Sequence, residues 1–172
     1  MRLDNQQGGG PDVLGALLAE LRPGLDHLGL PACVLDAHSV YRHANALYAA
    51  FVGQPAGSLL GKPVSRAFDQ EPRDDRRKAL ARALAGESLT FNRCTVAGPN
   101  EGRWVRAHYT PIRQAGAVIG VVVVLADIQD LKDAEAVVRD QERQLRLITD
   151  RGGWPIAYID REGRVRFASG PS

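Results

Sequence analysis

The amino-acid sequence predicts an α+β fold, in which helices cover one face of a five-stranded antiparallel sheet. Five segments rich in β-branched and aromatic residues are bounded by Gly, Pro, Asn and Asp residues, which is typical of short strands joined by turns. Two of these segments precede a run of helical patterns and three follow it. Strands that are grouped in this way, rather than alternating with helices, favour an antiparallel sheet with the helices on one side.

The composition narrows the class of protein. Of the 172 residues, 44% are hydrophobic and 24% are charged, as in an average globular domain and unlike a disordered or collagen-like chain. The 22 basic and 20 acidic residues balance too evenly for nucleic acid to be the main partner. The two cysteines, Cys33 and Cys94, lie far apart without CxxC spacing, which favours a reducing, cytoplasmic setting over a disulfide framework or a metal site.

The sequence also predicts no membrane contact by this segment. Its longest apolar run, residues 117–126, has about half of the roughly 20 residues that a membrane helix needs. The four consecutive valines of this run favour a buried strand. The N-terminus is polar and lacks the pattern of a signal peptide.

The first 28 residues predict a tail followed by a helical segment. Residues 1–10 contain three glycines and read as a flexible tail. The segment 11–28 opens with Pro11-Asp12, and the helix is expected to end at Arg22-Pro23-Gly24. Its apolar residues share one face, which must pack on another element: Val13, Leu14, Leu17, Leu18 and Leu21.

Residues 29–128 are expected to form the main domain, which begins with a hairpin and continues with helices. Asn45 is suited to cap the first of these helices, which ends at Gly53, and Gly86 is suited to end the last. The expected elements are strands 32–36 and 40–44, and helical stretches 45–53, 56–60 and 74–85.

The second half of this domain returns to strands and leads into a long polar helix. Glycine-containing turns separate the strands, and the last two form a hairpin. Asp127 is predicted to be the N-cap of the helix, with Asp130 at the third helical position. The expected elements are strands 89–97, 103–112 and 117–128 and a helix over 127–150, of which residues 129–150 form the linker.

The long helix carries a heptad pattern over three repeats. Leu131, Val138 and Leu145 recur every seven residues, and a second set follows three residues later. This second set comprises Ala134, Gln141 and Ile148. Two interpretations stay open: a parallel dimeric coiled coil, or a single amphipathic helix that lies on its own domain.

Residues 153–169 repeat the pattern of residues 29–45 at an offset of 124. The two stretches align without a gap and share five identities, which are Gly29/Gly153, Pro31/Pro155, Asp36/Asp160, Arg42/Arg166 and Ala44/Ala168. Residues 151–172 are therefore interpreted as the truncated start of a second domain of the same kind. Without the rest of its core, this segment is expected to be disordered or to pair with a neighbouring chain.

Several motifs in order resemble the PAS sensory-domain family. The stretch VLDAHSVYRHANALYAAFVG places Asp36 at the end of a strand and Asn45 at the start of a helix, as the family does. SLLGKPV (58–64) is similar to the family's Leu-Leu-Gly-Lys segment, and residues 103–128 are similar to its last two strands. ADIQDLK (126–132) is similar to the family's Asp-Ile-Thr exit motif, with Gln129 in place of the threonine.

The resemblance implies a sheet of strand order 2-1-5-4-3 that encloses a cavity for a ligand. It further implies a homodimer that passes its signal through the exit helix, with Asp127 as the coupling residue. The output domain of the full-length chain would be a histidine kinase, a diguanylate cyclase or phosphodiesterase, or a transcriptional regulator.

The sequence lacks the motifs of an enzyme, a metal centre and the usual PAS cofactors. Phosphate-loop, dinucleotide, zinc-protease and hydrolase motifs are absent, and the histidines do not cluster. Asn92-Arg93-Cys94 has the wrong order for a flavin-reactive cysteine, and Leu125 stands where flavin-binding relatives tend to carry Gln. The helix at 73–86 lacks a histidine for haem. Flavin and haem are therefore disfavoured, and no catalytic or metal-binding residue is assigned.

Alternation along the strands predicts the residues that line the interior. On the third strand either Phe91, Arg93 and Thr95 or the intervening residues Asn92, Cys94 and Val96 face inward. An inward Arg93 would require an anion such as a carboxylate ligand, whereas the other interpretation leaves Arg93 solvated at the sheet edge. The remaining candidates are Tyr41, His43 and Tyr48 near the cavity mouth, and Val105, Ala107, Tyr109, Val121, Val123 and Leu125 on the last two strands.

Two functions from different classes remain at this point. The first is a sensory module that binds a small apolar or carboxylate ligand, and the second is a structural dimerisation module with a filled core. The outward residues Trp104, Val122 and Val124 need a cover, for which the N-terminal helix is suited. The basic run over residues 73–82 is expected to be a solvated helix face, comprising Arg73, Arg76, Arg77, Lys78 and Arg82.

Overall fold

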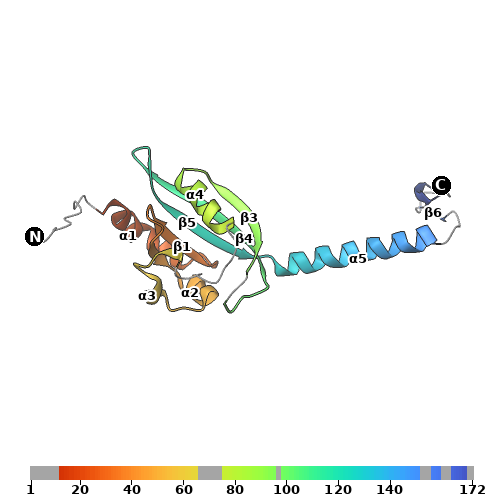
Figure 1. Ribbon diagram of the computed structural model, residues 1–172, viewed down its shortest axis with the longest axis horizontal. Coiled ribbons are helices and arrows are strands. Elements are labelled where there is room, and N and C mark those ends of the chain that lie inside the picture. Colours follow the sequence, from red (N-terminus) through yellow and green to blue (C-terminus); the bar gives the residue numbers. More distant parts are fainter. Residues whose placement is uncertain (1–11, 66–74, 96–97, 152–155, 160–163, 170–172) are drawn as a thin grey trace, which may run out of the picture. The chain divides into compact units, whose positions relative to one another are not determined.

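The computed structural model describes residues 12–65, 75–95, 98–151, 156–159 and 164–169, so the predicted tail at 1–10 lies outside the described residues. The chain divides into two units, the first ending at Ile128 and the second beginning at Gln129. The elements, shown in Figure 1, are α1 (Val13–Asp26), β1 (Ala32–Asp36), β2 (Tyr41–Ala44), α2 (Ala46–Val52), α3 (Ala56–Leu59), α4 (Asp75–Leu84), β3 (Leu89–Cys94), β4 (Trp104–Gln114), β5 (Ala117–Asp127), α5 (Gln129–Arg151), β6 (Ile156–Ile159) and β7 (Val165–Ser169).

The first unit is built on a five-stranded antiparallel sheet of order β2-β1-β5-β4-β3. This confirms the predicted α+β class and strand order. β5 lies at the centre of the sheet and pairs on one side with β1 and on the other with β4. Its alternating buried and half-buried residues are those expected of a strand that is covered on both faces.

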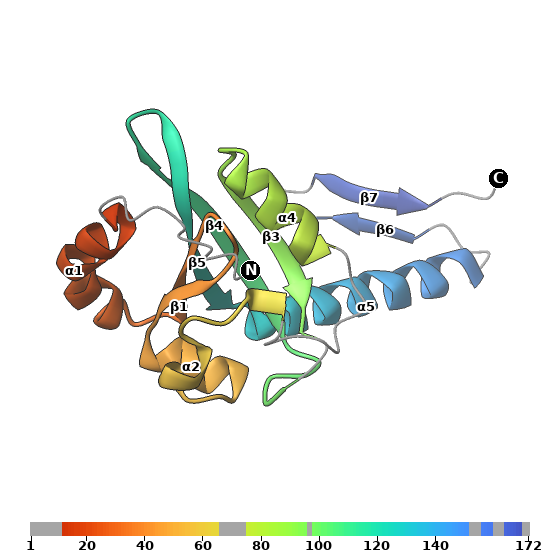
Figure 2. The same ribbon diagram turned by 60° about the vertical axis from the view of Figure 1, so that its left-hand side comes forward.

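The main core lies between the inner face of the sheet and the three helices α2, α3 and α4 (Figure 2). α2 begins at the predicted cap Asn45 and ends at Gly53, whose φ of 75° is the left-handed conformation expected after a helix. The helices contribute Tyr48, Val52, Leu59, Leu80 and Ala83 to this core, and the strands contribute Cys33, Leu35, Tyr41, Ala44, Ala107, Tyr109, Val121, Val123 and Leu125.

A second, smaller cluster lies on the outer face of the sheet, beneath α1. Leu14 and Leu18 of α1 bury Val34 of β1, with Leu25, Ile112, Ile119 and Val122 packed against them. Gly120 makes this approach possible, because a Cβ atom there would lie 2.5 Å from the Leu35 carbonyl oxygen and 3.3 Å from Cδ2 of Leu14. The prediction that the N-terminal helix covers the outer face is therefore confirmed for Val122. Trp104 and Val124 do not belong to this cluster.

The prediction that α1 ends at Arg22-Pro23-Gly24 is wrong, because the helix continues to Asp26. Pro23 has no amide hydrogen to donate, but its carbonyl accepts from the His27 amide at 3.2 Å and from His27 Nδ1 at 2.7 Å. Leu25 packs on the outer cluster, and its carbonyl accepts from Asn45 Nδ2. Tertiary contacts therefore hold a helical turn after the proline.

Asn45 is the junction of four segments and is only 1% exposed. Its Oδ1 accepts from the amide of Ala32 at 3.0 Å and from the amide of Tyr48 at 2.8 Å. Its Nδ2 donates to the carbonyls of Leu25 at 3.0 Å and Leu30 at 2.8 Å. One amide group thus joins α1, the following loop, β1 and the first turn of α2, and its donors and acceptor are all used.

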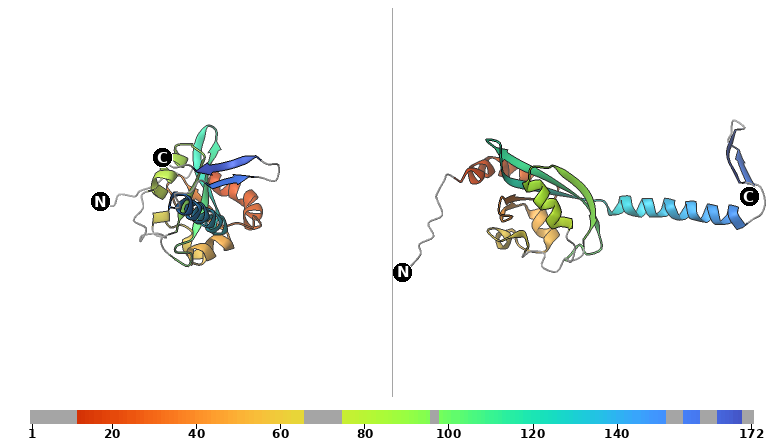
Figure 3. Two further views of the ribbon diagram at one scale, coloured as in Figure 1. Left: turned by 90° about the vertical axis from the view of Figure 1, so that its right-hand side faces the viewer. Right: turned by 45° about the horizontal axis from the view of Figure 1, so that its top comes forward.

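The second unit contains α5, a single unbroken helix (Figure 3), and the hairpin of β6 and β7. For the described part of residues 153–172, the hairpin corrects the expectation of disorder or of pairing with another chain, because β6 and β7 pair with each other. Residues 153–155, 160–163 and 170–172 lie outside the described residues. Its partners Ala157↔Ala168 and Tyr158↔Phe167 correspond, at the offset of 124, to Cys33↔Ala44 and Val34↔His43. The register shift falls at the equivalent position in both hairpins, so the sequence repeat is also a repeat of strand pairing.

Replacing Asn45 with Asp should strongly destabilise the first unit. The carboxylate keeps the acceptor but loses both donors and faces the carbonyls of Leu25 and Leu30, for which we expect a loss of about 2–4 kcal/mol in the free energy of unfolding at pH 7. Burial raises the pKa of the introduced carboxyl group in the folded state, so the loss should shrink as the pH falls toward 4 and the group regains a donor. Urea denaturation at both pH values measures this.

Asn92→Asp provides the matched control. Asn92 is exposed and its Oδ1 accepts from Arg106 Nε at 3.0 Å, a bond that a carboxylate keeps. Its change in unfolding free energy should stay within about 0.5 kcal/mol. Equal effects of the two substitutions would contradict the special role of Asn45.

Candidate functional site

The inner face of the sheet carries most of the predicted interior residues. Val105, Ala107 and Tyr109 of β4 are buried, and so are Val121, Val123 and Leu125 of β5. Cross-strand pairs such as Ala107↔Leu125 and Tyr109↔Val123 bring these residues together on one face. The predicted alternation of these two strands is confirmed, while a role of the six residues in ligand binding stays a prediction.

The register of β3 resolves the alternative that the sequence left open. Phe91 pairs with Ala107 and Arg93 with Val105, and paired residues of an antiparallel ladder point to the same face. Phe91 and Arg93 therefore face the interior, and the Phe91 ring stacks on Tyr109 with centroids 5.6 Å apart. Nε of Arg93 is closed off from solvent, so this arginine is not simply solvated at the sheet edge. Val96 lies outside the described residues.

Tyr41 and Tyr48 form a buried hydroxyl pair rather than the mouth of a cavity. Their hydroxyl oxygens lie 3.1 Å apart, and both side chains are almost fully buried. The Tyr48 hydroxyl is also close enough to Cys33 to oppose, in part, the effect of burial on the pKa of its thiol. Burial raises the pKa of both tyrosines well above their ordinary value and raises the pKa of the Cys33 thiol to about 12. All three groups are therefore neutral at pH 7.

His43, a predicted cavity residue, lies on the other face of the sheet. It pairs with Val34, which belongs to the outer cluster beneath α1. Its Nε2 lies 3.1 Å from Oδ1 of Asp26, the last residue of α1. Strict alternation would place His43 on the same face as Tyr41, two residues before it. The prediction was wrong because the strand pairing shifts register between Val34 and Leu35, which turns His43 to the other face.

The sequence interpretation missed Arg76, which it placed on a solvated helix face. Arg76 precedes Ala79, Leu80 and Ala83 by three, four and seven residues, and these three are the buried face of α4. Nη1 of Arg76 is closed off from solvent. The sequence therefore already indicated that Arg76 shares a helix face with these three apolar residues. Arg77, Lys78 and Arg82 are exposed as predicted, and Arg73 lies outside the described residues.

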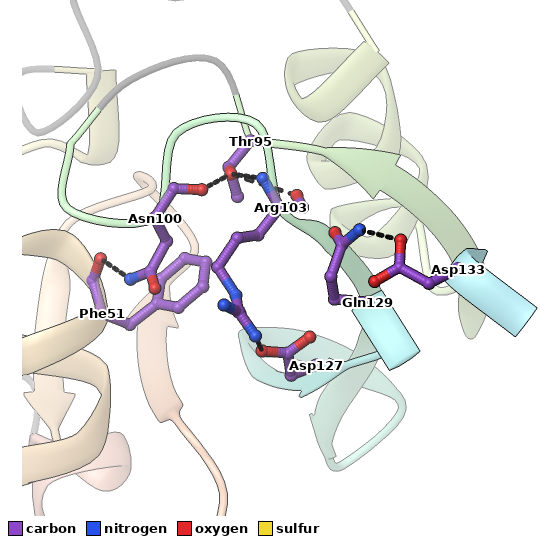
Figure 4. A network of polar contacts seen from close by, with 7 residues as sticks. All are labelled: Phe51, Thr95, Asn100, Arg103, Asp127, Gln129 and Asp133. Atoms are coloured by element: carbon purple, nitrogen blue, oxygen red, sulfur yellow. Dashed lines mark hydrogen bonds and ion pairs between the residues drawn. The ribbon is translucent and has the colours of Figure 1, made fainter. Parts of the chain in front are cut away.

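A polar corner forms where β5 ends, as Figure 4 shows. Arg103 donates to Asp127 Oδ2 from Nη2 at 2.6 Å and from Nε at 3.0 Å. Both side chains are about half exposed, which limits the contribution of this pair to stability. Asp127 is the last residue of β5 and α5 begins at Gln129, so the predicted N-cap position falls on Ile128 instead. The amide of Ile128 donates to the Trp104 carbonyl.

The same corner is connected to α2 through the turn that precedes Arg103. Asn100 Nδ2 donates to the carbonyl of Phe51 in α2 at 2.9 Å, and the Asn100 carbonyl accepts from the hydroxyl of Thr95. Thr95 Oγ1 in turn accepts from the Arg103 amide at 3.2 Å. At Gly53 a Cβ atom would lie 2.7 Å from the Pro99 ring, so this glycine lets the turn rest on the end of α2.

The described residues show few features of a metal or membrane site. Among them, no group of three His, Cys, Asp or Glu residues is placed to hold a metal ion. No helix in the described part of the chain is long and apolar enough to span a bilayer. Cys94 pairs with Trp104 across β3 and β4, on the face opposite to Arg93, so its thiol is directed away from the interior.

Comparisons with known proteins agree with this architecture. A family model described as PAS fold matches residues 25–133. The PAS domain of Bordetella pertussis BvgS has a TM-score of 0.59 at 22% identity, over 75% of this chain and 98% of that one. A Rhodobacter sphaeroides LOV protein has a TM-score of 0.56 at 15% identity, over 66% and 67% of the two chains.

A sensory box sensor histidine kinase from Vibrio cholerae has a TM-score of 0.51 at 17% identity, over 66% of this chain and 94% of that one. At such identities the likeness concerns the fold alone. No curated protein sequence matches the chain.

The Cys33 thiol should be inert toward thiol reagents in the folded protein. With a pKa of about 12, only about one in ten thousand of these thiols is ionised at pH 8, and the side chain is fully buried. Because the pKa is raised on folding, this thiol lowers stability only as the pH rises from 9 toward 12. Ellman's reagent at pH 8 should titrate Cys94 first and Cys33 only after unfolding in guanidinium chloride.

The variant Cys94→Ser is the control for this experiment, since it should leave no thiol that reacts in the folded state. Two rapidly reacting thiols in the native wild-type protein would show that the Cys33 environment opens readily.

Proposed function

The chain belongs to the PAS fold family, and on this basis we propose that it is the sensory and regulatory module of a larger signalling protein. In this proposal the domain binds a small ligand at the inner face of its sheet, associates as a homodimer, and passes the signal through α5. The output domain is a histidine kinase, a diguanylate cyclase or phosphodiesterase, or a transcriptional regulator. The sensor histidine kinase among the structural neighbours supports this class of function.

The ion pair of Arg103 and Asp127 is the observation that carries the proposal. Asp127 is the last residue of the sheet before the chain passes into α5, and Arg103 follows a turn that is bonded to α2. A displacement of α2 or of the strand ends would therefore reach the start of α5 through a few hydrogen bonds. Surface pairs of this kind contribute little to stability, which suits a contact that changes between two states.

A structural dimerisation module is the second candidate. The core residues Val121, Val123 and Leu125 are each less than 5% exposed, as expected of an interior that its own side chains fill. In this case the domain would hold two chains together without binding a ligand. A mass measured for the purified protein under native conditions distinguishes the two candidates, because a sensory module would carry or take up a small molecule.

The apolar stripe of α5 supports association through this helix. Leu131, Val138 and Leu145 are 47%, 55% and 64% exposed, which is unusual for large apolar residues of one helix stripe. In a parallel coiled coil these residues would become buried at the seam. The side chain of Ile148, the fourth predicted seam residue, lies outside the described residues.

The β6–β7 hairpin supports a second domain of the same family. Its strand pairing repeats that of β1 and β2, including the position of the register shift. At the offset of 124, Ser169 stands in place of Asn45, and serine is also a favoured helix cap. In this proposal α5 connects two PAS domains.

Three further expectations stay predictions. We infer that this chain has no catalytic activity of its own and does not bind nucleic acid. A location in the cytoplasm is favoured by Cys33 and Cys94, which are both free thiols.

Replacing Asp127 with Asn should uncouple the sheet from α5 while the domain stays folded. The free energy of unfolding should change by less than about 1 kcal/mol, because the pair with Arg103 is half exposed. Hydrogen exchange of the amides in the first two turns of α5 should become severalfold faster, which mass spectrometry of the peptides measures. In the full-length protein the same substitution should abolish the response to the signal.

Glu87→Gln is the matched control, because Glu87 forms a similarly exposed ion pair with Arg82 at the other end of the domain. It should leave exchange in α5 unchanged. Equal exchange in both variants, or an unchanged signal response of the Asp127 variant, would contradict the coupling role.

Replacing Leu145 with Lys should dissociate the homodimer. The seam position cannot bury an ammonium group, so the dissociation constant measured by sedimentation equilibrium should rise by at least about tenfold. Leu147→Lys is the control, because Leu147 is also exposed but lies two residues further along, on the opposite side of the helix. A wild-type chain that sediments as a monomer, or equal effects of both variants, would contradict the coiled coil.

A further inference from the structure

The repeat that relates residues 29–45 to residues 153–169 extends backwards into the helices that precede them. At the same offset of 124, α1 aligns without a gap with residues 137–150, which form the last part of α5. α5 ends at Arg151, the counterpart of His27, which is the residue that caps the end of α1. Four of the 14 aligned residues are identical, namely Val13/Val137, Leu21/Leu145, Arg22/Arg146 and Asp26/Asp150.

The boundaries of the strands follow the same offset. β6 begins at Ile156, the counterpart of Ala32, which is the first residue of β1. β7 begins at Val165, the counterpart of Tyr41, which is the first residue of β2. The second unit therefore repeats the helix, strand and strand of the first unit with the same spacing between them. Residues 129–136, about two helical turns, are the part of α5 that precedes the repeat.

In the first unit the repeated helix covers the outer face of the sheet. Leu14 of α1 is 5% exposed, because with Leu18 it packs on Val34 of β1. Leu21, one heptad after Leu14, is 42% exposed. The sheet residues in this cluster come from β1, β4 and β5, and they are Val34, Ile112, Ile119 and Val122.

Val138 stands at the position of Leu14 and is 55% exposed in α5. The hairpin of β6 and β7 repeats β1 and β2, whereas three of the four sheet residues beneath α1 come from β4 and β5. A hairpin alone therefore offers this helix little apolar surface, and a complete second sheet would offer the rest. The exposure of Val138 is that of a cover helix whose sheet consists of two strands.

The apolar pair of Leu18 and Val34 is exchanged at both positions in the repeat. Glu142 stands at the position of Leu18, and Tyr158 stands at the position of Val34. A carboxylate alone would be costly on an apolar sheet face, but a tyrosine hydroxyl can donate a hydrogen bond to it. The paired exchange keeps the two positions compatible, as expected of residues that meet in a folded domain.

We propose that residues 137–150 of α5 are the cover helix of the second domain, and that Val138 packs on the outer face of the sheet to which β6 belongs. This inference rests on the proposed second PAS domain and adds the surface that α5 contacts there. Because α5 is a single helix that begins two residues after Asp127, a displacement at the exit of the first sheet moves a helix that is part of the second domain. Leu145, the counterpart of the exposed Leu21, stays available to a second copy of the chain.

The test measures how fast single introduced cysteines react with N-ethylmaleimide in the full-length protein, followed for each site by mass spectrometry of its peptide. Leu14→Cys and Leu21→Cys calibrate the rates in the first domain, where the first position is buried and the second is exposed. Val138→Cys should react at least about tenfold more slowly than Leu147→Cys, because a covered thiol reacts only when the helix detaches. Leu147 is the control position, since its counterpart Pro23 is exposed in α1.

Two further substitutions identify what covers the cysteine at position 138. Tyr158→Lys should make its reaction fast, because an ammonium group cannot be buried beneath the helix, whereas Leu145→Lys should leave the reaction slow. Circular dichroism establishes that each variant is folded. A fast reaction of Val138→Cys alone, a slow reaction that persists with Tyr158→Lys, or one that becomes fast with Leu145→Lys overturns the proposal. The last result would assign Val138 to a coiled coil. The sensory function is tested separately by the signal response of the Asp127 variant and does not fall with any of these results.

Discussion

The four hydrogen bonds of Asn45 hold the first unit together. The side-chain amide joins the end of α1, the loop at Leu30, the first residue of β1 and the first turn of α2, and it does so in a place closed to water. A buried amide with all its partners present stabilises one arrangement, whereas the loss of any partner leaves a polar group desolvated. Asn45 therefore connects α1 and α2 to the start of β1.

The sheet separates two clusters of different composition. The outer cluster beneath α1 is apolar and closely packed, and Gly120 leaves room for Leu14 to approach the strand backbone. The inner face combines a core of alternate strand residues with the hydroxyl pair of Tyr41 and Tyr48 and with arginines from β3 and α4. Both arginines and the hydroxyl pair lie on the inner face, whereas the buried His43 lies on the outer face beside Asp26.

The exit of the domain is built differently from its core. Arg103 and Asp127 form a half-exposed ion pair, and the turn before Arg103 is connected to α2 by hydrogen bonds rather than by apolar burial. Such contacts can be exchanged at small free-energy cost, whereas the Asn45 junction cannot. The fold therefore has a buried, fully hydrogen-bonded junction at the beginning of the domain and a half-exposed ion pair at its end, where β5 precedes α5.

The sequence by itself determined the α+β class, the strands, the Asn45 cap and the inward residues of β4 and β5, because local propensity and strict alternation act over a few residues. Its repeat predicted that residues 153–169 copy the first hairpin, and the strand pairing agrees. Only the tertiary structure decided the face of His43, where a register shift breaks the alternation, and the direction of Arg93, which depends on its partner Val105. It also decided the helical turn after Pro23 and the Arg103 partner of Asp127. Each of these depends on contacts between residues far apart in the chain, which local patterns do not encode.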